Sequence, residues 1–492
     1  MARYWPLAVA TIVGAALRFY ALGANSLWVD EFATLSIASH SPAEILRLSS
    51  SANFIPPLYF LLVHGVLQVF GESEVALRLL SAVAGICTIP VVWLLTEQIT
   101  RSRSTANIAA ALLAINPLHL WFSQEARPYA LLLFFGCCAL LSLQRAVRTE
   151  SLRHWMAFSV WSALTVLTHT TGLLFGVIAW TWALWSSDRR RVVRPLLASS
   201  LAVGLACTPF FLAIAGALVA THGTFHSSPR SLTGLEIPYT LLTFVTGFSF
   251  GPAPREIQNL GALGAVRSHP LQSVLAGAVL CGLIVTSGLK RRATMTYFIA
   301  LLGIPLAGIF VLSALSGKAY NVRYTLPALV GFLGIVSIAT RALGPRSRAL
   351  WLTALMGLAL WADVQWFCSA RYWKEDSRAA VAWLRDNLDP GATVAVAPNY
   401  CVLPLAYYTR KAGAELRFLP ILPGVGFPGG TPPDALVLTR LHHVPNWREL
   451  KADFVGLIGV RVREGHVAGY EMLVRPQLQQ RIGHSTARAH VP

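Results

Sequence analysis

The sequence has few charged residues. Only 13% of its 492 residues are Asp, Glu, Lys or Arg, whereas soluble domains carry about 25%. Hydrophobic residues make up 55%. A soluble core does not accommodate such an excess, so most of the chain is expected to face lipid.

Acidic residues are scarcer than basic ones, with 22 Asp and Glu against 40 Lys and Arg and a net charge of +18. A basic excess can indicate nucleic-acid binding. In a polytopic membrane protein it reflects cytoplasmic loops rich in Lys and Arg. We expect eleven spans, near residues 5–22, 75–97, 104–120, 129–147, 155–168, 171–186, 195–220, 271–289, 294–316, 322–340 and 349–367.

The loop charges give this count an orientation. If the N-terminus is cytoplasmic, the arginine clusters, such as Arg189–Arg191, all fall in inner loops, and outer loops hold single basic residues. This distribution accounts for much of the net charge, and no nucleic-acid partner is expected. This alternation of inner and outer loops holds only if residues 56–71 do not cross the membrane. That stretch is short and begins with Pro-Pro, and we expect it to be an interfacial or re-entrant helix in a first outer loop, 23–74. Residues 41–50 resemble a second interfacial helix, and 221–270 form another outer loop.

The cysteines follow no metal-binding spacing. Most lie in apolar segments and are expected to be small buried hydrophobes. Only Cys368 and Cys401 are candidates for an outer aqueous region, and whether they pair is left open.

The character of the chain changes after residue 368. Apolar residues at helical spacing near 380–388 precede a strand-like run at 393–397. Further strand-like runs occur at 435–439 and 455–462, with a helix-like stretch between them. We expect a transmembrane domain over 1–368, a small extracytoplasmic α/β domain over 369–480 and a disordered tail over 481–492. A cleaved signal peptide at the N-terminus is the alternative for the first span, but cleavage would detach the anchor just before Asp30.

Adjacent carboxylates follow the first span in "SLWVDEFAT". Asp30 and Glu31 are flanked by Trp28 and Phe32, so they are expected at the membrane interface. Ionisable groups near low dielectric are costly and tend to be functional. The plainer interpretation is a solvated helix-to-loop junction, with Trp28 as an interfacial anchor.

A second outer turn carries "SQEARPYALL". Glu125 and Arg127 stand just before Pro128, and an apolar helix resumes at Tyr129. Pro favours the first turn of a helix, and a helix N-terminus suits an anion such as phosphate. The alternative is a weak ion pair within the loop.

Further outer-side candidates are His169 in "LTHTTGLL" and the basic and aromatic residues of "GKAYNVRYTLPAL", namely Lys318, Arg323 and Tyr324. For His169 a hydrogen-bonded structural role is favoured over ligand contact. For the basic residues, and for Arg18 and Arg78, phosphate contact competes with snorkelling to the interface. Together these groups suit a transferase that uses a lipid-phosphate donor: a carboxylate to deprotonate a hydroxyl, and cations to stabilise the departing phosphate.

At these residues the chain resembles the GT-C membrane glycosyltransferases, specifically the bacterial family-39-like branch related to protein O-mannosyltransferases and lipid A aminoarabinose transferases. The motifs are "SLWVDEFAT", the stretches 56–85 and 116–135, "LTHTTGLL" and "NVRYTLPAL". The similarity covers residues 5–190 well and 295–390 loosely. The short loop 221–270 departs from protein mannosyltransferases, which carry a further domain between spans, and Asn53 stands where many relatives have an acid or His.

The resemblance implies a GT-C fold, a polyprenyl-phosphate-sugar donor and inverting transfer at the outer face of a bacterial inner membrane. The acceptor would be a lipid, glycan or protein hydroxyl. By position, Asp30 matches the catalytic base and Glu31 its acidic neighbour. Donor phosphate or metal is assigned to Glu125, Arg127, His169 and Arg323, and substrate binding to Trp28, Tyr129, Lys318 and Tyr324. A divalent metal (Mg, Mn or Zn) would lie at Asp30 and Glu125.

Two other functions are alternatives to this one. A transporter or flippase of lipid-linked sugars would favour ionisable groups at mid-membrane and repeat symmetry between halves, and neither is clear. A receptor whose ligand site lies in 370–480 would not need eleven spans.

Overall fold

The computed structural model describes residues 4–51, 56–185, 189–220, 232, 234–257, scattered residues from 264 to 277, 293–316, 320–422, 424–427, 432–458 and 463–475. By their contacts these residues form two compact units. The first comprises the chain to Asn25 and Ala33–Tyr372; the second comprises Ser26–Phe32 and the chain from Trp373 onward. The predicted tail, 481–492, lies outside the described residues.

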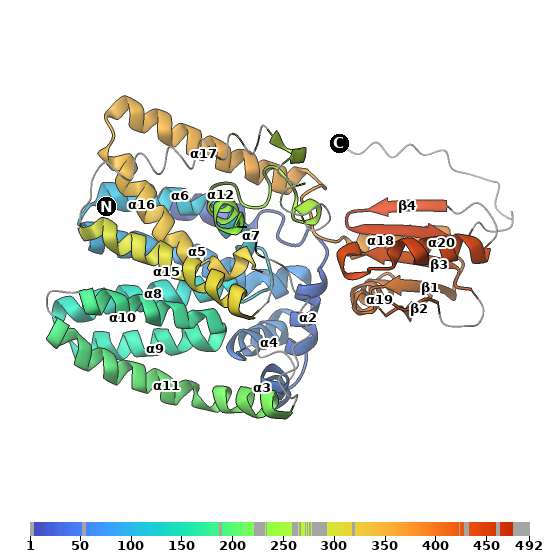
Figure 1. The fold of residues 1–492 in the computed structure, drawn as a ribbon, viewed down its shortest axis with the longest axis horizontal. Coiled ribbons are helices and arrows are strands. Elements are labelled where there is room, and N and C mark those ends of the chain that lie inside the picture. Colours follow the sequence, from blue (N-terminus) through green and yellow to red (C-terminus); the bar gives the residue numbers. More distant parts are fainter. Residues whose placement is uncertain are drawn as a thin grey trace. The chain divides into compact units, whose positions relative to one another are not determined.

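The first unit is helical (Figure 1). Five of its described helices are long and apolar enough to cross a membrane: α5 (Glu74–Thr100), α8 (Tyr129–Thr149), α11 (Arg189–Ala220), α15 (Ala293–Ser316) and α17 (Pro345–Cys368). A bent pair, α6 (Arg103–Ala114) and α7 (Pro117–Ser123), makes a sixth if counted as one span. The protein is therefore a multi-pass membrane protein, and the count of eleven spans stays a prediction.

Shorter helices complete this unit. They are α1 (Trp5–Phe19), α3 (Pro42–Ser51), α4 (Leu58–Phe70), α9 (Leu152–Thr168), α10 (Leu173–Trp185), α12 (Glu236–Thr246) and α16 (Ala328–Ala342), with 3₁₀ turns η1 (Thr170–Gly172) and η2 (Val322–Thr325). α2 (Val29–Ala38) begins in the second unit and continues into the first from Ala33. The predicted helices at 41–50 and 56–71 are present as α3 and α4. With 13 residues, α4 is shorter than the roughly 20 that a span needs.

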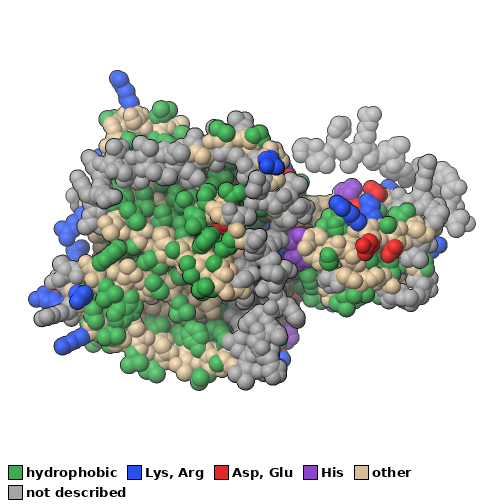
Figure 2. Space-filling model, viewed as in Figure 1, with side chains coloured by type: hydrophobic (Ala, Val, Ile, Leu, Met, Phe, Trp, Pro, Cys, Tyr) green, Lys and Arg blue, Asp and Glu red, His purple; other side chains and the backbone are tan. Residues whose placement is uncertain are grey.

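Hydrophobic side chains cover much of the visible face of the helical unit, and Lys and Arg gather mainly at its left-hand end (Figure 2). Arg101 and Arg148, from two loops predicted to be cytoplasmic, line one small polar pocket with Glu97 and Gln98. These two loops therefore share a side, as the positive-inside pattern requires.

A 57° bend separates α6 from α7. Asn116 caps α7, because its side-chain oxygen accepts a hydrogen bond from the His119 N–H (2.9 Å) and Pro117 occupies the first helical position. The Asn116 amide also donates to the Phe244 carbonyl of α12 (2.7 Å). The sequence thus ends one helix and starts another within the apolar run.

Arg18 and Arg78 do not snorkel, and that interpretation was wrong. Arg18 is fully buried and donates to the carbonyls of Gly14 and Ala114 (both 2.9 Å) and to His119 Nδ1 (2.7 Å). Arg78 donates to the carbonyls of Leu22 (2.8 Å) and Asn25 (3.0 Å). Both guanidinium groups donate hydrogen bonds to backbone carbonyls inside the helical unit, and these buried hydrogen bonds stabilise it.

The second unit is an α/β domain built on a five-stranded sheet of order β2-β1-β3-β5-β4. The strands are β1 (Ala392–Ala397), β2 (Leu416–Pro420), β3 (Ala435–Thr439), β4 (Arg463–Val467) and β5 (Tyr470–Val474). β1 pairs in parallel with β2 and β3, whereas β5 is antiparallel to β3 and β4. The strands predicted near 393–397 and 435–439 are β1 and β3.

Helices cover both faces of this sheet. α20 (Trp447–Ile458) packs Leu450 and Phe454 against inward-facing residues of β1 and β3. α18 (Ser377–Asn387) and α19 (Val402–Lys411) pack against each other, away from that core cluster. The strand predicted at 455–462 was wrong over 455–458, where α20 continues, and 459–462 lie outside the described residues. β-branched residues favour strands, but here the buried apolar stripe of the helix prevails.

Candidate active site

The Glu125–Arg127 turn joins α7 to α8. The Arg127 N–H donates to the Glu125 carbonyl (2.8 Å) and tightens the turn. Pro128 precedes the first residue of α8, Tyr129, as predicted. The Arg127 carbonyl accepts a hydrogen bond from Ser81 Oγ of α5 (3.1 Å), so the turn is also fixed from outside.

His169 lies between α9 and η1, where it caps the 3₁₀ turn. Its Nδ1 accepts a hydrogen bond from the Thr171 N–H (3.2 Å). In the neutral ring this leaves the proton on Nε2. The structural role favoured from the sequence is therefore real, and it also orients a second ring nitrogen.

Arg323 is held by a second local cap. The side-chain oxygen of Asn321 accepts a hydrogen bond from the Arg323 N–H (3.1 Å) at the start of η2. The guanidinium carbon lies 5.4 Å from the centre of the Tyr324 ring. Lys318, the third residue predicted here, lies outside the described residues.

These three segments meet. The His169 ring centroid lies 5.4 Å from that of Tyr129 and 5.7 Å from that of Tyr324. Burial, with the charges of Arg127 and Arg323 acting in the same sense, lowers the pKa of His169 to about 3. The imidazole is thus neutral at physiological pH, between two cations. The structure brings together six residues singled out from the sequence: Glu125, Arg127, Tyr129, His169, Arg323 and Tyr324.

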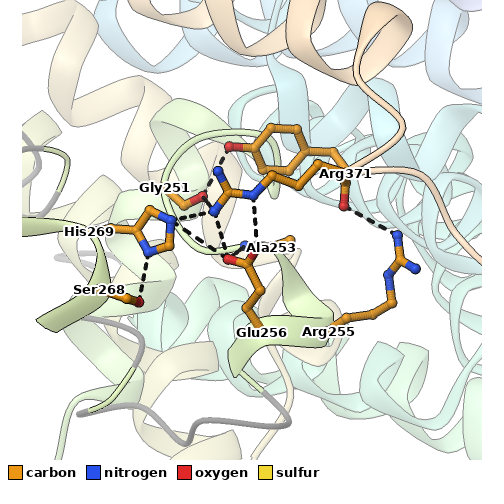
Figure 3. Close-up of polar contacts among 8 residues, drawn as sticks. Gly251, Ala253, Arg255, Glu256, Ser268, His269 and Arg371 are labelled. Atoms are coloured by element: carbon orange, nitrogen blue, oxygen red, sulfur yellow. Dashed lines mark hydrogen bonds and ion pairs between the residues drawn. The ribbon is translucent and has the colours of Figure 1, made fainter. Parts of the chain in front are cut away.

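A further polar cluster joins the segment after α12 to the segment after α17 (Figure 3). Arg371 donates to both carboxylate oxygens of Glu256, at 2.8 and 2.7 Å, and also contacts His269. Burial is the largest single influence and raises the pKa of Glu256, but the hydrogen bonds from Arg371 and the Ala253 N–H, together with the charges of Arg371 and His269, outweigh it and lower the net pKa. This bidentate ion pair joins the segment after α12 to the segment after α17, just before the second unit begins.

The remaining predicted residues belong to the second unit. Glu31 is fully buried, and its carboxylate accepts a hydrogen bond from the Trp28 N–H (3.4 Å) at the start of α2. Asp30 is partly exposed, and it interacts electrostatically with Arg440, just after β3. Two cations lie over the Trp28 ring: Lys374 Nζ is 4.9 Å and the guanidinium carbon of Arg440 is 5.3 Å from the ring centroid.

Arg440, Glu375 and Lys374 were not found from the sequence. The available signal was weak: a charged residue that follows a buried parallel strand, the position at which α/β sheets place functional groups. Nothing in the local pattern connects that position to residue 30.

A divalent metal was predicted from the resemblance, at Asp30 and Glu125. Within the described ranges, no three His, Cys, Asp or Glu side chains gather as metal ligands. The metal predicted at Asp30 and Glu125 stays a prediction, and no chemical step is routed through it.

Part of the chain matches a known protein family. Residues 55–213 match the family described as dolichyl-phosphate-mannose-protein mannosyltransferase. An uncharacterized protein of Aquifex aeolicus (strain VF5) is 27% identical over 165 residues, which is 31% of this chain and 32% of that protein. The chain thus matches about a third of the length of this relative.

Solved structures extend the likeness to nearly the whole chain. Apo ArnT from Cupriavidus metallidurans superposes with a TM-score of 0.57 at 13% identity, over 96% of this chain and 98% of that one. The chain has the GT-C glycosyltransferase fold. ArnT bound to undecaprenyl phosphate gives a TM-score of 0.51 at 14% identity, over 97% and 99% of the two chains. An Archaeoglobus fulgidus oligosaccharyltransferase, crystallised with Zn and sulfate, gives 0.51 at 13% identity, over 96% of this chain and 73% of that one.

Several candidate residues lie beside helix ends: Glu125 and Arg127 between α7 and α8, and His169 between α9 and η1. A fold hosts several chemistries, so the activity must be argued from the site itself. The family match ends at residue 213, so Arg323 and most of the second unit lie outside it.

Proposed function

We propose that the protein is an inverting glycosyltransferase that moves a sugar from a polyprenyl-phosphate donor to an acceptor hydroxyl. One observation carries the proposal. Arg127 and Arg323, from distant parts of the chain, both act on the neutral His169 beside a pair of tyrosines. Two guanidiniums around a neutral donor ring form a site for a phosphate at the ends of membrane helices.

The chemistry follows from these groups. The donor phosphate lies between Arg127 and Arg323, and His169 Nε2–H donates to one of its oxygens. When the bond between the anomeric carbon and the phosphate oxygen breaks, the electron pair stays on that oxygen. The cations stabilise the added negative charge. A departing phosphate needs no general acid because its conjugate acid is strong.

Asp30 completes the reaction as general base. It takes the proton of the acceptor hydroxyl as the acceptor oxygen forms its bond to the anomeric carbon from the side opposite the phosphate. Inversion at that carbon follows from this single displacement. Glu31 holds the start of α2, and Trp28 and Tyr129 border the sugar.

We place this reaction at the outer face of a bacterial cytoplasmic membrane, with the N-terminus cytoplasmic and residues 369–480 forming a soluble extracytoplasmic domain. The clustering of the arginine-rich loops supports this orientation. A reporter fused after residue 370 tests it, since activity on the cytoplasmic side would reverse the topology.

The test of function uses the purified full chain in lipid nanodiscs. Undecaprenyl phosphate carrying labelled hexoses or pentoses is supplied as donor, with whole envelope extract, lipids included, as acceptor, and transfer of label from the donor to any other lipid, glycan or protein is measured. We expect Asp30→Asn to reduce transfer by about 10²–10⁴-fold, the usual contribution of a general base. Full activity of Asp30→Asn would remove the assigned base.

Donor binding separates the phosphate site from the base. Arg127→Gln and Arg323→Gln should each weaken binding of undecaprenyl monophosphate by about tenfold or more, as expected for loss of one charge-assisted contact. Asp30→Asn should leave that binding unchanged. Equal binding by the arginine variants and wild type would place the phosphate elsewhere.

The structure gives little support to the alternative function, a transporter of lipid-linked sugars. It would favour ionisable groups inside the membrane unit, and Arg18 and Asp363 are indeed buried there. However, Arg18 is engaged by backbone carbonyls and His119, as expected of a structural residue. Net movement of labelled donor across vesicles without transfer would favour this alternative.

A further inference from the structure

A polar pocket lies at the far end of α8 from the candidate active site. It is lined by Glu97 and Gln98 of α5, by Arg101, which follows α5, and by Arg148 in the last turn of α8. Its volume is about 320 Å³, within the range of about 300–1,000 Å³ that is usual for ligand pockets. Every lining side chain is polar, so the pocket suits a polar ligand.

The length of α8 places this pocket at the level of lipid headgroups. The helix starts at Tyr129, in the candidate active site, and its 21 residues end just after Arg148. At 1.5 Å per residue it spans about 30 Å, which is the hydrocarbon thickness of a typical bilayer. α5 packs against α8 and ends beside the same pocket. The pocket and the candidate donor site therefore lie about one bilayer apart.

Arg101 has an uncommon backbone conformation. Its φ of 53° and ψ of 30° lie in the left-handed region, where its N–H donates to the Glu97 carbonyl (2.7 Å) and closes α5. Glycine is the usual residue at such a helix end, because other residues avoid this region. Residues held there cluster at functional sites. The conformation fixes where the Arg101 side chain leaves the helix.

The two arginines of the pocket are not used by the protein itself. Within the part of the chain that the structure describes, the side chains of Arg101 and Arg148 make no hydrogen bond or ion pair, and both are exposed. A neighbouring arginine, Arg191, instead pairs with Glu150 (3.4 Å). Two like charges around one pocket repel each other, and an anion between them removes the repulsion.

The charge of the pocket favours a phosphodiester. Its two arginines and Glu97 leave a net charge of +1. A phosphodiester carries one negative charge and neutralises this, whereas a phosphate monoester carries about −1.5 to −2 at pH 7 and leaves a negative excess. Guanidinium groups bind phosphate oxygens through short, charge-assisted hydrogen bonds. The Glu97 carboxylate accepts hydrogen bonds only, so it suits a hydroxyl on the rest of the ligand.

We propose that this pocket binds the phosphodiester of a glycerophospholipid headgroup, with phosphatidylglycerol as the best fit. Arg101 and Arg148 contact the phosphate, and Glu97 accepts a hydrogen bond from a glycerol hydroxyl. Basic pockets between membrane helices are established sites for anionic headgroups. A soluble glycerophosphodiester has the same chemistry, and the experiment separates the two sources. The site is independent of sugar transfer, so it stands or falls apart from the function proposed above.

The experiment is a lipid titration followed by native mass spectrometry. Phosphatidylglycerol is added in increasing amounts to the delipidated full chain in detergent, and the affinity of the first bound lipid is measured. Arg101→Gln and Arg148→Gln should each weaken it about tenfold or more, as expected for loss of one charge-assisted contact, and the double variant further. Phosphatidylcholine has the same phosphate but no headgroup donor for Glu97, so it should bind wild type more weakly.

Controls separate the pocket from general basic charge. Arg153→Gln/Arg346→Gln removes two exposed arginines of α9 and α17 and should leave the affinity unchanged. Arg127→Gln, at the proposed donor site, should also leave it unchanged. Arg101→Gly removes the side chain at a backbone position that glycine prefers, so its loss of affinity is not due to misfolding. Lysine at both pocket positions keeps the charge without the planar fork and should give intermediate affinity.

The outcomes are distinct. Equal affinity of wild type and Arg101→Gln/Arg148→Gln overturns the proposal, and so does an equal loss in Arg153→Gln/Arg346→Gln, which would indicate unspecific attraction to basic loops. Soluble glycerophosphoglycerol, the same headgroup without acyl chains, is the competing probe. Displacement of phosphatidylglycerol only by a large excess of this probe identifies the lipid as the ligand. Displacement at comparable concentration supports the phosphodiester site and makes its ligand a soluble molecule.

Discussion

Replacing Arg18 by Met tests the interior of the membrane unit. The guanidinium serves three acceptors outside its own helix: the carbonyls of Leu113 (3.2 Å) and Ala114 (2.9 Å), and His119 Nδ1 (2.7 Å). A buried acceptor left without its donor costs about 1–3 kcal/mol. The simple sum is an upper bound, because water and backbone shifts relieve part of it.

Asp363 adds to this cost. Its carboxyl group is buried and interacts electrostatically with Arg18, and neither oxygen has a hydrogen-bond partner among the described residues. Without Arg18 this carboxyl group loses the positive charge that acts on it. The three acceptors left without a donor set the scale, so after partial relief we expect Arg18→Met to cost about 3–5 kcal/mol.

The assay is reversible unfolding in mixed micelles by increasing SDS, followed by tryptophan fluorescence. Arg346→Met, at an exposed arginine of α17, is the matched control and should stay within about 0.5 kcal/mol of wild type. Arg18→Met/Asp363→Leu should recover part of the loss, with a coupling of about 0.5–3 kcal/mol. An Arg18→Met protein as stable as Arg346→Met would refute the reasoning.

Three further predictions concern other parts of the chain. Glu256→Gln should lower the unfolding temperature at pH 7. The pKa of Glu256 is lowered in the folded protein, so its carboxylate stabilises the fold above the ordinary pKa of about 4.3, and this stabilisation is lost as pH falls through the lowered pKa. The difference in unfolding temperature between variant and wild type should therefore close at pH 3. Gly136→Ala should destabilise the bundle by about 1–3 kcal/mol, because an added Cβ would lie 2.3 Å from the Phe175 ring; Gly176→Ala, with no atom within 4 Å, is its control, and equal stability of the two would contradict this packing. A membrane-impermeant maleimide should label the exposed Cys368 in intact cells and spare Cys401, whose burial raises its pKa to about 12; both are free thiols, and labelling of Cys401 first would contradict the fold of the α/β domain.

The sequence predicted those features that depend on local chemistry. Pro128 marked the start of α8 at Tyr129, and the apolar run 435–439 gave β3 with its bounds. From the residues alone, Arg127, His169 and Arg323 were predicted to share the outer side of the membrane, and the resemblance assigned all three to a donor-phosphate site. The structure adds a specific contact, because the His169 ring centroid lies within 6 Å of the ring centroids of Tyr129 and Tyr324.

What the sequence could not predict depends on contacts between distant segments. Arg18 looked like an interfacial residue because snorkelling is judged from position along a helix, whereas its partners are on α6 and α7. Arg440 had no motif at all. The strand predicted over 455–458 failed because α20 buries an apolar stripe against β3, a contact that local propensity does not contain.

The attachment of Ser26–Phe32 to the second unit sets an order for biosynthesis. The 340 residues Ala33–Tyr372 are made between this segment and its partners. At about 5–20 residues per second, that interval lasts roughly 20–70 seconds. During it Lys374 and Arg440, the two cations on the Trp28 ring, have not yet been made. The nascent chain therefore enters the membrane before the segment that carries Asp30, the proposed base, has its partners, and a chain truncated before the sheet stays in that state.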